Sequence, residues 1–148
     1  MRLFTTLSLI CFCLLFNCED KKTSVTNAKM TPKHCMESVL KQDDSLGKVR
    51  NHACERISLS KTIDQYANAI NNLNYNACPN EFEEAFKKHA EAWIKMGIFT
   101  EKYPDLRGEM HDIFDSIEKT QDSSEFKPLL KSIWDTWAKV EAAKVIEE

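Results

Sequence analysis

Apolar residues beyond about residue 30 recur three or four positions apart, which is the spacing of one face of an α-helix. No segment alternates between apolar and polar residues in the way that a half-buried strand does. Residues that interrupt helices are also few, because the chain of 148 residues contains only 3 glycines and 4 prolines. The pattern therefore predicts an all-α fold.

The clearest helix begins near Cys78 and Pro79. Pro79 suits the first helical position, and Asn80 with Glu83 offers a capping box as the alternative, so either choice starts the helix at nearly the same place. Its apolar face consists of Phe82, Ala85, Phe86, His89, Ala92, Trp93 and Met96. The charged residues lie elsewhere, so this helix buries one side and exposes the other.

Two more helices are predicted downstream. Tyr103 precedes Pro104, and the residue before a proline is pushed out of the helical region, so the chain breaks there. A helix then covers about 105–119, and another covers about 123–146 with Pro128 in its first turn, where the missing N–H costs little. Each helix has one apolar face to bury.

The first part of the domain is predicted to form a short helix and a long one. Thr31 starts the short helix, which ends near Leu40, and the polar residues 43–45 supply a turn. The long helix covers about 46–72, and residues 58–60 kink or divide it. Together with the downstream helices, this pattern predicts a four-helix bundle with a short extra N-terminal helix.

The first twenty residues have the form of a bacterial export signal. Arg2 supplies the positive start, and an apolar run of about 14 residues follows, which is shorter than the roughly 17 to 25 residues of a membrane-spanning helix. The run ends in Leu15-Phe16-Asn17-Cys18, which resembles the relaxed lipobox of lipoproteins from spirochaetes and some other bacterial phyla. The resemblance implies that a signal peptide of residues 1–17 is removed and that Cys18 becomes the lipid-modified N-terminus.

The alternative is an ordinary cleaved signal whose Cys18 pairs in a disulfide, because Phe16 and Asn17 are larger than the residues that usually precede a lipidated cysteine. The change from apolar to polar residues at Cys18 itself favours lipidation. Residues 18–30 then form a flexible tether, since this polar stretch buries too little apolar surface to fold. Residues 31–148 form a single helical domain. We therefore expect a protein held by lipid at the bacterial cell envelope, specifically at the outer membrane.

The charge balance limits the class of partner. Arg2 is one of the 20 Lys and Arg residues, so the mature chain keeps 19 against 23 Asp and Glu, a net charge of about −4. This mild and evenly mixed acidity is typical neither of nucleic-acid-binding proteins nor of a polybasic membrane patch. The expected partners are membrane lipid, through Cys18, and an envelope or host protein, with no nucleic acid.

Lipidation of Cys18 would leave an odd number of thiols in the domain, and therefore at most one internal disulfide. Cys35 and Cys54 lie almost symmetrically about the predicted turn at 43–45, so a hairpin there makes them the first choice of pair. A break at residues 58–60 would allow Cys54 to pair with Cys78 instead. In the first case Cys78 is left over at a helix N-terminus, where the helix dipole favours the thiolate.

The sequence contains no familiar enzyme pattern. The nucleophile elbow, the phosphate-binding glycine loop and the zinc-protease motif are absent, so we predict no enzyme activity, catalytic residue, cofactor or metal site. His89 lies about 16 Å from Cys78 along one helix and is more simply a core residue bonded through one ring nitrogen. The alternative is a redox or metal-handling protein that uses Cys78 with His89, or the cluster of His34-Cys35 with His52 and Cys54.

One segment is similar to a pattern in small exported helical bacterial proteins of unassigned function: Cys78-Pro79-x-x-Phe82-x-x-Ala85-Phe86-x-x-His89-x-x-Ala92-Trp93. The resemblance implies only that this helix organises the fold. The chain has 3 tryptophans, more than so small a core easily buries, and exposed aromatic residues are common at interfaces. We expect Trp93 and Trp137 in the core and Trp134 with Tyr103 at a binding surface. The predicted function is a binding or structural module of the envelope.

Overall fold

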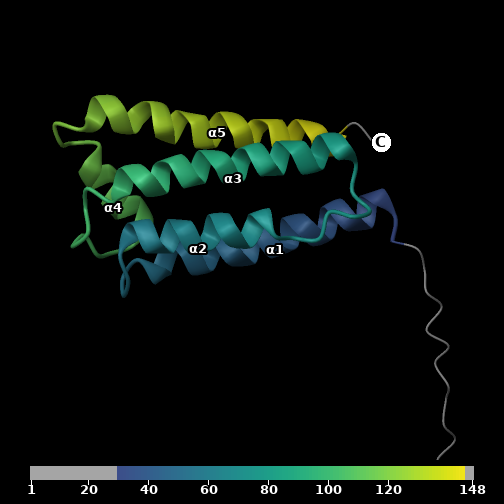
Figure 1. Cartoon of the computed structure of the whole chain (residues 1–148), viewed down its shortest axis with the longest axis horizontal. Helices are drawn as coiled ribbons and strands as arrows, with labels where there is room; N and C mark the ends of the chain where they lie inside the picture. Colours follow the sequence, from purple (N-terminus) through teal and green to yellow (C-terminus); the bar gives the residue numbers. More distant parts are fainter. Residues whose placement is uncertain (1–29, 146–148) are drawn as a thin grey trace, which may run out of the picture.

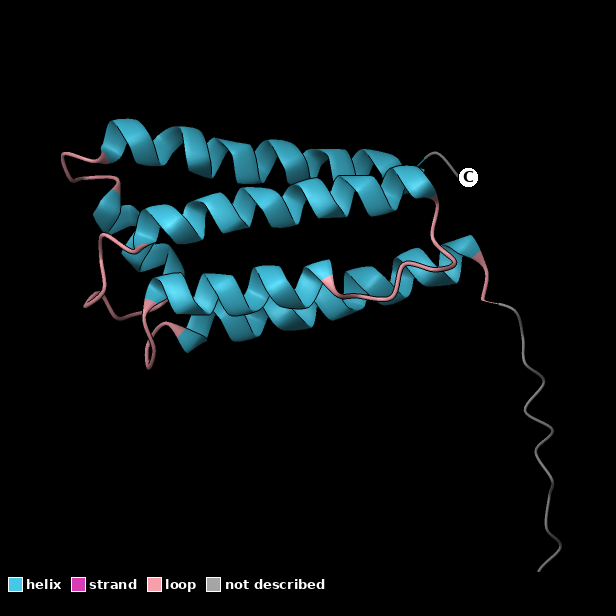
Figure 2. Cartoon of the chain, in the orientation of Figure 1, coloured by secondary structure: helices cyan, strands magenta, loops and turns pink. Residues whose placement is uncertain are grey.

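The computed structural model describes residues 30–145, and in this range the chain forms five helices and no strand (Figure 2). The helices are α1 (Pro32–Ala53), α2 (Leu59–Asn71), α3 (Asn80–Thr100), α4 (Met110–Ile117) and α5 (Ser123–Val145). The predicted all-α bundle is confirmed. The predicted signal peptide of residues 1–17, the lipidation site Cys18 and nearly all of the 18–30 tether lie outside the described residues.

α3 is the central element of the bundle. It packs along α5 on one side and along α2 on the other, and α1 packs against α2 and contacts the short α4 (Figure 1). α1 and α5 are not an extensively packed pair, so the side of the bundle between them is only partly closed. Within residues 30–145, no helix is both long and apolar enough to cross a membrane.

The buried apolar residues form two clusters. The larger one, between α2, α3, α4 and α5, includes the fully buried Leu59, Ile63, Ile70, Met96, Ile117 and Phe126. The smaller one, where α1 begins and α5 ends, includes Cys35, Val39, Phe82, Phe86 and Val140. Gly97 lets α2 and α3 approach closely, because a Cβ at this position would lie 3.2 Å from Ile63 Cγ2.

α1 is one uninterrupted helix, so the predicted turn at residues 43–45 and the separate short helix ending near Leu40 are wrong. The side chains that favour a turn are satisfied within the helix or by a neighbour. Ser45 Oγ donates to the Lys41 carbonyl at 3.0 Å, and Lys48 pairs with Asp44 at 2.6 Å. Asp43 accepts a hydrogen bond from Tyr66 of α2. With these contacts made, the helix continues through residues 43–45.

The chain divides at residues 54–58 instead, and Ser58 caps α2 by accepting a hydrogen bond from the Lys61 N–H. A division near residues 58–60 is one of the two predicted outcomes. The single interrupted helix predicted over 46–72 is wrong, because residues 46–53 belong to α1 and α2 begins at Leu59. α4 begins at Met110, later than the predicted residue 105, because Glu109 caps it. Pro128 lies in the second turn of α5, one turn further in than predicted.

Candidate functional site

The disulfide of the domain joins Cys35 to Cys78, with 5.1 Å between their Cα atoms. Both predicted pairings of Cys54, with Cys35 and with Cys78, are therefore wrong. The reason is the continuity of α1, which separates Cys35 from Cys54 by roughly 28 Å at 1.5 Å per residue. The same continuity places Cys35, near the start of α1, beside the segment that leads into α3.

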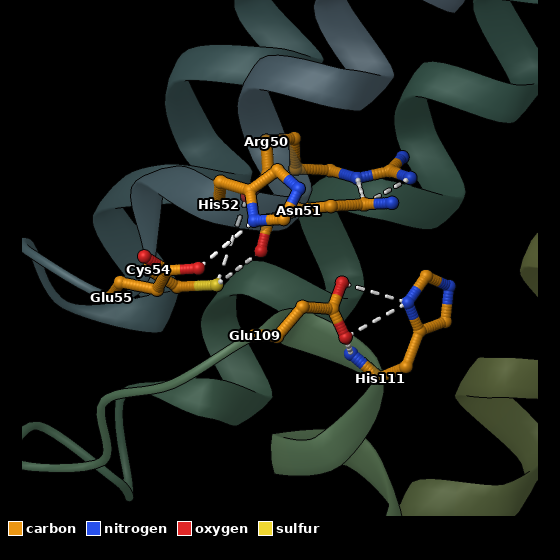
Figure 3. Close-up of polar contacts among 7 residues, drawn as sticks. All are labelled: Arg50, Asn51, His52, Cys54, Glu55, Glu109 and His111. Carbon is orange, nitrogen blue, oxygen red and sulfur yellow. Dashed lines mark hydrogen bonds and ion pairs between the residues drawn. The ribbon is translucent and has the colours of Figure 1, made fainter.

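Within residues 30–145, Cys54 is the free cysteine, and it is fully buried. Its Sγ lies 3.3 Å from the Asn51 carbonyl and 3.7 Å from the Arg50 carbonyl (Figure 3). Burial raises the pKa of the Cys54 thiol, which disfavours the reactive thiolate. None of the three cysteines in the redox or metal alternative thus carries an accessible thiol, since Cys54 is buried and Cys78 is bonded to Cys35.

The groups of the predicted metal alternative are not brought together. His34 and His52 lie at opposite ends of α1, and His52 pairs instead with Glu55 at 2.9 Å (Figure 3). His89 lies inside the bundle, away from Cys78. Among residues 30–145, no group of three or more His, Cys, Asp and Glu side chains is placed to hold a metal ion.

A cavity of about 340 Å³ lies where α1 and α5 face each other, and side chains from all five helices line it. Helical spacing explains how each helix contributes. The lining residues lie seven apart in α1, four apart in α3, and three or four apart in α5, so each set occupies one face. The aromatic part of the lining is Tyr66, Trp93, Phe114, Trp134 and Trp137. All 3 tryptophans of the chain thus meet at one cavity.

Two oppositely charged residues of α1 also line this cavity, Asp43 and Arg50. The Asp43 side chain is only 8 % exposed, and its carboxyl accepts a hydrogen bond of 2.7 Å from the Tyr66 hydroxyl. Burial raises the pKa of the Asp43 carboxyl, and the hydrogen bond from Tyr66 and the charge of Arg50 only partly offset this rise. A buried charged group of this kind is costly to a small domain.

Arg50 is half-buried and is held by two aromatic rings. Its guanidinium carbon lies 4.3 Å from the centre of the Tyr66 ring and 4.1 Å from the centre of the Trp93 ring. Both distances are within the range of cation–π attraction. Two nitrogens of the guanidinium donate to the side-chain oxygen of Asn51, at 3.2 and 3.0 Å (Figure 3). The position of the charge is therefore fixed before any ligand arrives.

His89 forms the inner wall of the cavity, and both of its ring nitrogens are used. The Trp93 indole N–H donates to His89 Nε2 at 3.0 Å, so Nδ1 carries the hydrogen that bonds Thr136 Oγ1 at 3.0 Å. Burial, assisted by the positive charge of Arg50, lowers the pKa of His89 to about 4. The predicted core role of His89 is confirmed, with two bonded nitrogens in place of the one predicted.

The rim of the cavity is exposed. Trp134 is 61 % exposed, and His111 and Asp115 of α4 are also open to solvent. The structure does not bring the predicted surface residue Tyr103 to this site. Tyr103 packs on Phe99 and donates to Asp122 at 2.6 Å, in the segment between α3 and α4.

The sequence contained a signal for the two charged residues that α1 contributes to the cavity. Asp43 and Arg50 are seven residues apart, a spacing that places two side chains on one helical face. The predicted turn at 43–45 obscured it, because it assigned the two residues to different elements. No protein-family model, curated protein or solved structure matches the chain.

Proposed function

We propose that the chain is an exported protein, anchored to the bacterial envelope by lipid on Cys18, whose helical domain binds a small amphipathic molecule in the cavity between α1 and α5. The cavity carries this proposal. Its volume of about 340 Å³ lies in the range of small-molecule sites, which are mostly apolar with a few convergent polar groups. Asp43, Arg50 and His89 supply such groups in an aromatic lining.

The outward position of one tryptophan also supports a binding role. A large apolar side chain is normally buried when the fold allows it, yet Trp134 stays largely exposed at the cavity rim. An aromatic residue so placed gains apolar contact when a ligand covers it. The anchor complements this role, since the polar segment of about 12 residues that follows Cys18 would hold the domain roughly 20 Å from the membrane.

Filling the cavity tests the binding proposal. Leu130 is a half-buried residue of the cavity lining, and its neighbour Leu129 is half-buried outside the cavity. We expect Leu130→Trp to abolish the binding of small aromatic compounds, detected by saturation-transfer NMR on the purified protein. Leu129→Trp adds the same bulk elsewhere and should leave binding intact. Compounds that bind the wild type and Leu130→Trp equally well would contradict the proposal, as would the lack of any binding compound.

The anchor is tested separately. We expect mass spectrometry of the mature N-terminus to find a lipid-modified Cys18. Cys18→Ala should release the protein from the membrane fraction. An unmodified N-terminus, or a protein that fractionates identically with and without Cys18, would contradict the lipid anchor and leave the cavity proposal standing.

A further inference from the structure

We infer that the ligand of this cavity is a planar aromatic carboxylate, with its carboxylate on the guanidinium of Arg50 and its ring against Trp134 and Trp137. This inference rests on the proposed binding function. It adds to it the chemical class of the ligand and assigns Arg50 as the residue that selects that class.

Arg50 has the properties of an anion receptor. In residues 30–145 its guanidinium forms no ion pair, although the side chain is half-buried and lines the cavity. Its protein hydrogen bonds go to the neutral side chain of Asn51. An arginine has five N–H donors in a planar fork that matches a carboxylate, so donors remain for a ligand.

The rings that hold Arg50 make it a preorganised donor. Tyr66 and Trp93 both lie within 4.3 Å of the guanidinium carbon, so the long side chain is already ordered. The ligand therefore need not offset the entropy of fixing it. A hydrogen bond between a guanidinium and a carboxylate is among the stronger polar contacts in proteins.

The other inner polar groups are already engaged. The Asp43 carboxyl accepts from Tyr66, and both nitrogens of His89 are hydrogen-bonded, with the ring neutral at physiological pH. The acidic Asp115 and the imidazole of His111 lie at the exposed rim. His111 is itself paired with Glu109 at 2.8 Å. The strongest free donor that faces the interior is therefore Arg50.

The aromatic walls complement a planar ring. Trp134 forms no aromatic pair with another ring in the described part of the chain, so its faces are available to a ligand. Trp137 lies deeper and packs against His89, with 5.4 Å between ring centres. A flat apolar ring between these residues would gain offset or edge-to-face contacts.

Three probes of nearly equal shape test the charge preference on the wild-type protein. They are indole-3-acetate, the neutral indole-3-acetamide and the cationic tryptamine, each titrated into the purified protein by calorimetry near pH 7. We expect the carboxylate to bind at least tenfold more tightly than the amide, because a charge-assisted pair adds about one factor of ten or more to affinity. Tryptamine should bind most weakly, since its ammonium is repelled by Arg50.

Arg50 is tested with a matched control. Arg50→Gln should weaken indole-3-acetate at least tenfold and change indole-3-acetamide less than about threefold. Arg56→Gln removes an exposed arginine outside the cavity and should change neither. Thermal unfolding checks that each variant folds. The comparison of the three probes on the wild type remains valid even if Arg50→Gln does not fold.

The outcomes separate this inference from the proposed function. Equal affinities for all three probes would overturn the carboxylate inference and keep the cavity as a binding site. Tightest binding of tryptamine would also overturn it and point to Asp43 and Asp115 as the selective groups. If no probe binds while Leu130→Trp and wild type behave alike, both the inference and the proposed function fail.

Discussion

The end of the bundle that carries the disulfide and the middle that carries the cavity are built in opposite ways. At the disulfide end, Val39, Phe82 and Val140 pack with no exposed surface, and the Cys35–Cys78 bond ties α1 to the start of α3. In the middle, the buried positions include Asp43 and His89, and the side between α1 and α5 is partly open. One region combines buried apolar side chains with a disulfide, and the other keeps polar groups that are costly to bury.

The difference supports the binding role proposed for the middle of the bundle. Buried polar groups are tolerated when they are hydrogen-bonded, and in the middle of the bundle each has a partner: Tyr66 for Asp43, and Trp93 with Thr136 for His89. Apolar side chains at these positions would pack without such requirements. A domain that combines a rigid, covalently closed end with a polar and partly open middle is suited to hold a binding site in a fixed geometry.

The largest effect is expected at the disulfide end. Replacing both Cys35 and Cys78 by Ala should lower the free energy of unfolding by about 4 kcal/mol, since the bond spans 43 residues and restricts the unfolded chain. Urea titration measures the loss. Probe binding in the cavity should persist, because Arg50 and Trp134 lie outside this end. Cys54→Ala is the control, with an expected loss of about 1 kcal/mol for a small buried side chain. A double variant as stable as the wild type would contradict the pairing.

The next effect is a pH dependence that originates in the middle. The pKa of His89 is lowered to about 4 in the folded protein from an ordinary 6.5. Above pH 6.5 both states are neutral and the stability is complete. As the pH falls from 6.5 to 4, only the unfolded state takes up the proton, so about 3 kcal/mol is lost.

His89→Gln isolates this contribution, because a glutamine can accept from Trp93 and donate to Thr136 without titrating. The raised pKa of Asp43 acts in the opposite direction, since the folded state then takes up a proton more readily than the unfolded state as the pH falls. Both proteins share the Asp43 contribution, so subtracting the pH dependence of His89→Gln from that of the wild type removes it. Parallel curves for wild type and His89→Gln between pH 4 and 6.5 would show that His89 is not buried and neutral.

A smaller effect tests the hydrogen bond between Tyr66 and Asp43. Tyr66→Phe leaves a buried carboxyl without its donor and should cost about 1 to 3 kcal/mol. Combining it with Asp43→Leu should recover part of the loss, since both partners are then apolar. A double-mutant cycle of unfolding free energies measures the coupling. Strictly additive losses would indicate that the two side chains do not interact.

Local patterns in the sequence were sufficient to predict the buried face of a helix where packing follows the helical period. The face of α3 from Phe82 to Met96 and the buried position of His89 followed from residue spacing. The continuity of α1 could not be predicted from local patterns, because Asp43 is stabilised in the helix by Tyr66, 23 residues away. Once that turn was misplaced, the disulfide partner of Cys35 was misassigned as well. Trp134 is exposed at the cavity, while its part in binding stays a prediction.

The indole N–H groups of the 3 tryptophans test most directly whether the cavity between α1 and α5 is the binding site, because all three side chains line it. In ¹⁵N–¹H spectra of the purified protein, assigned with single Trp→Phe variants, indole-3-acetate should shift the signals of Trp134 and Trp137 in a saturable manner. The Trp93 signal should move less, because its N–H stays bonded to His89. Unmoved tryptophan signals, with shifts gathered instead around the exposed Ile94 and Ile98 of α3, would contradict the account.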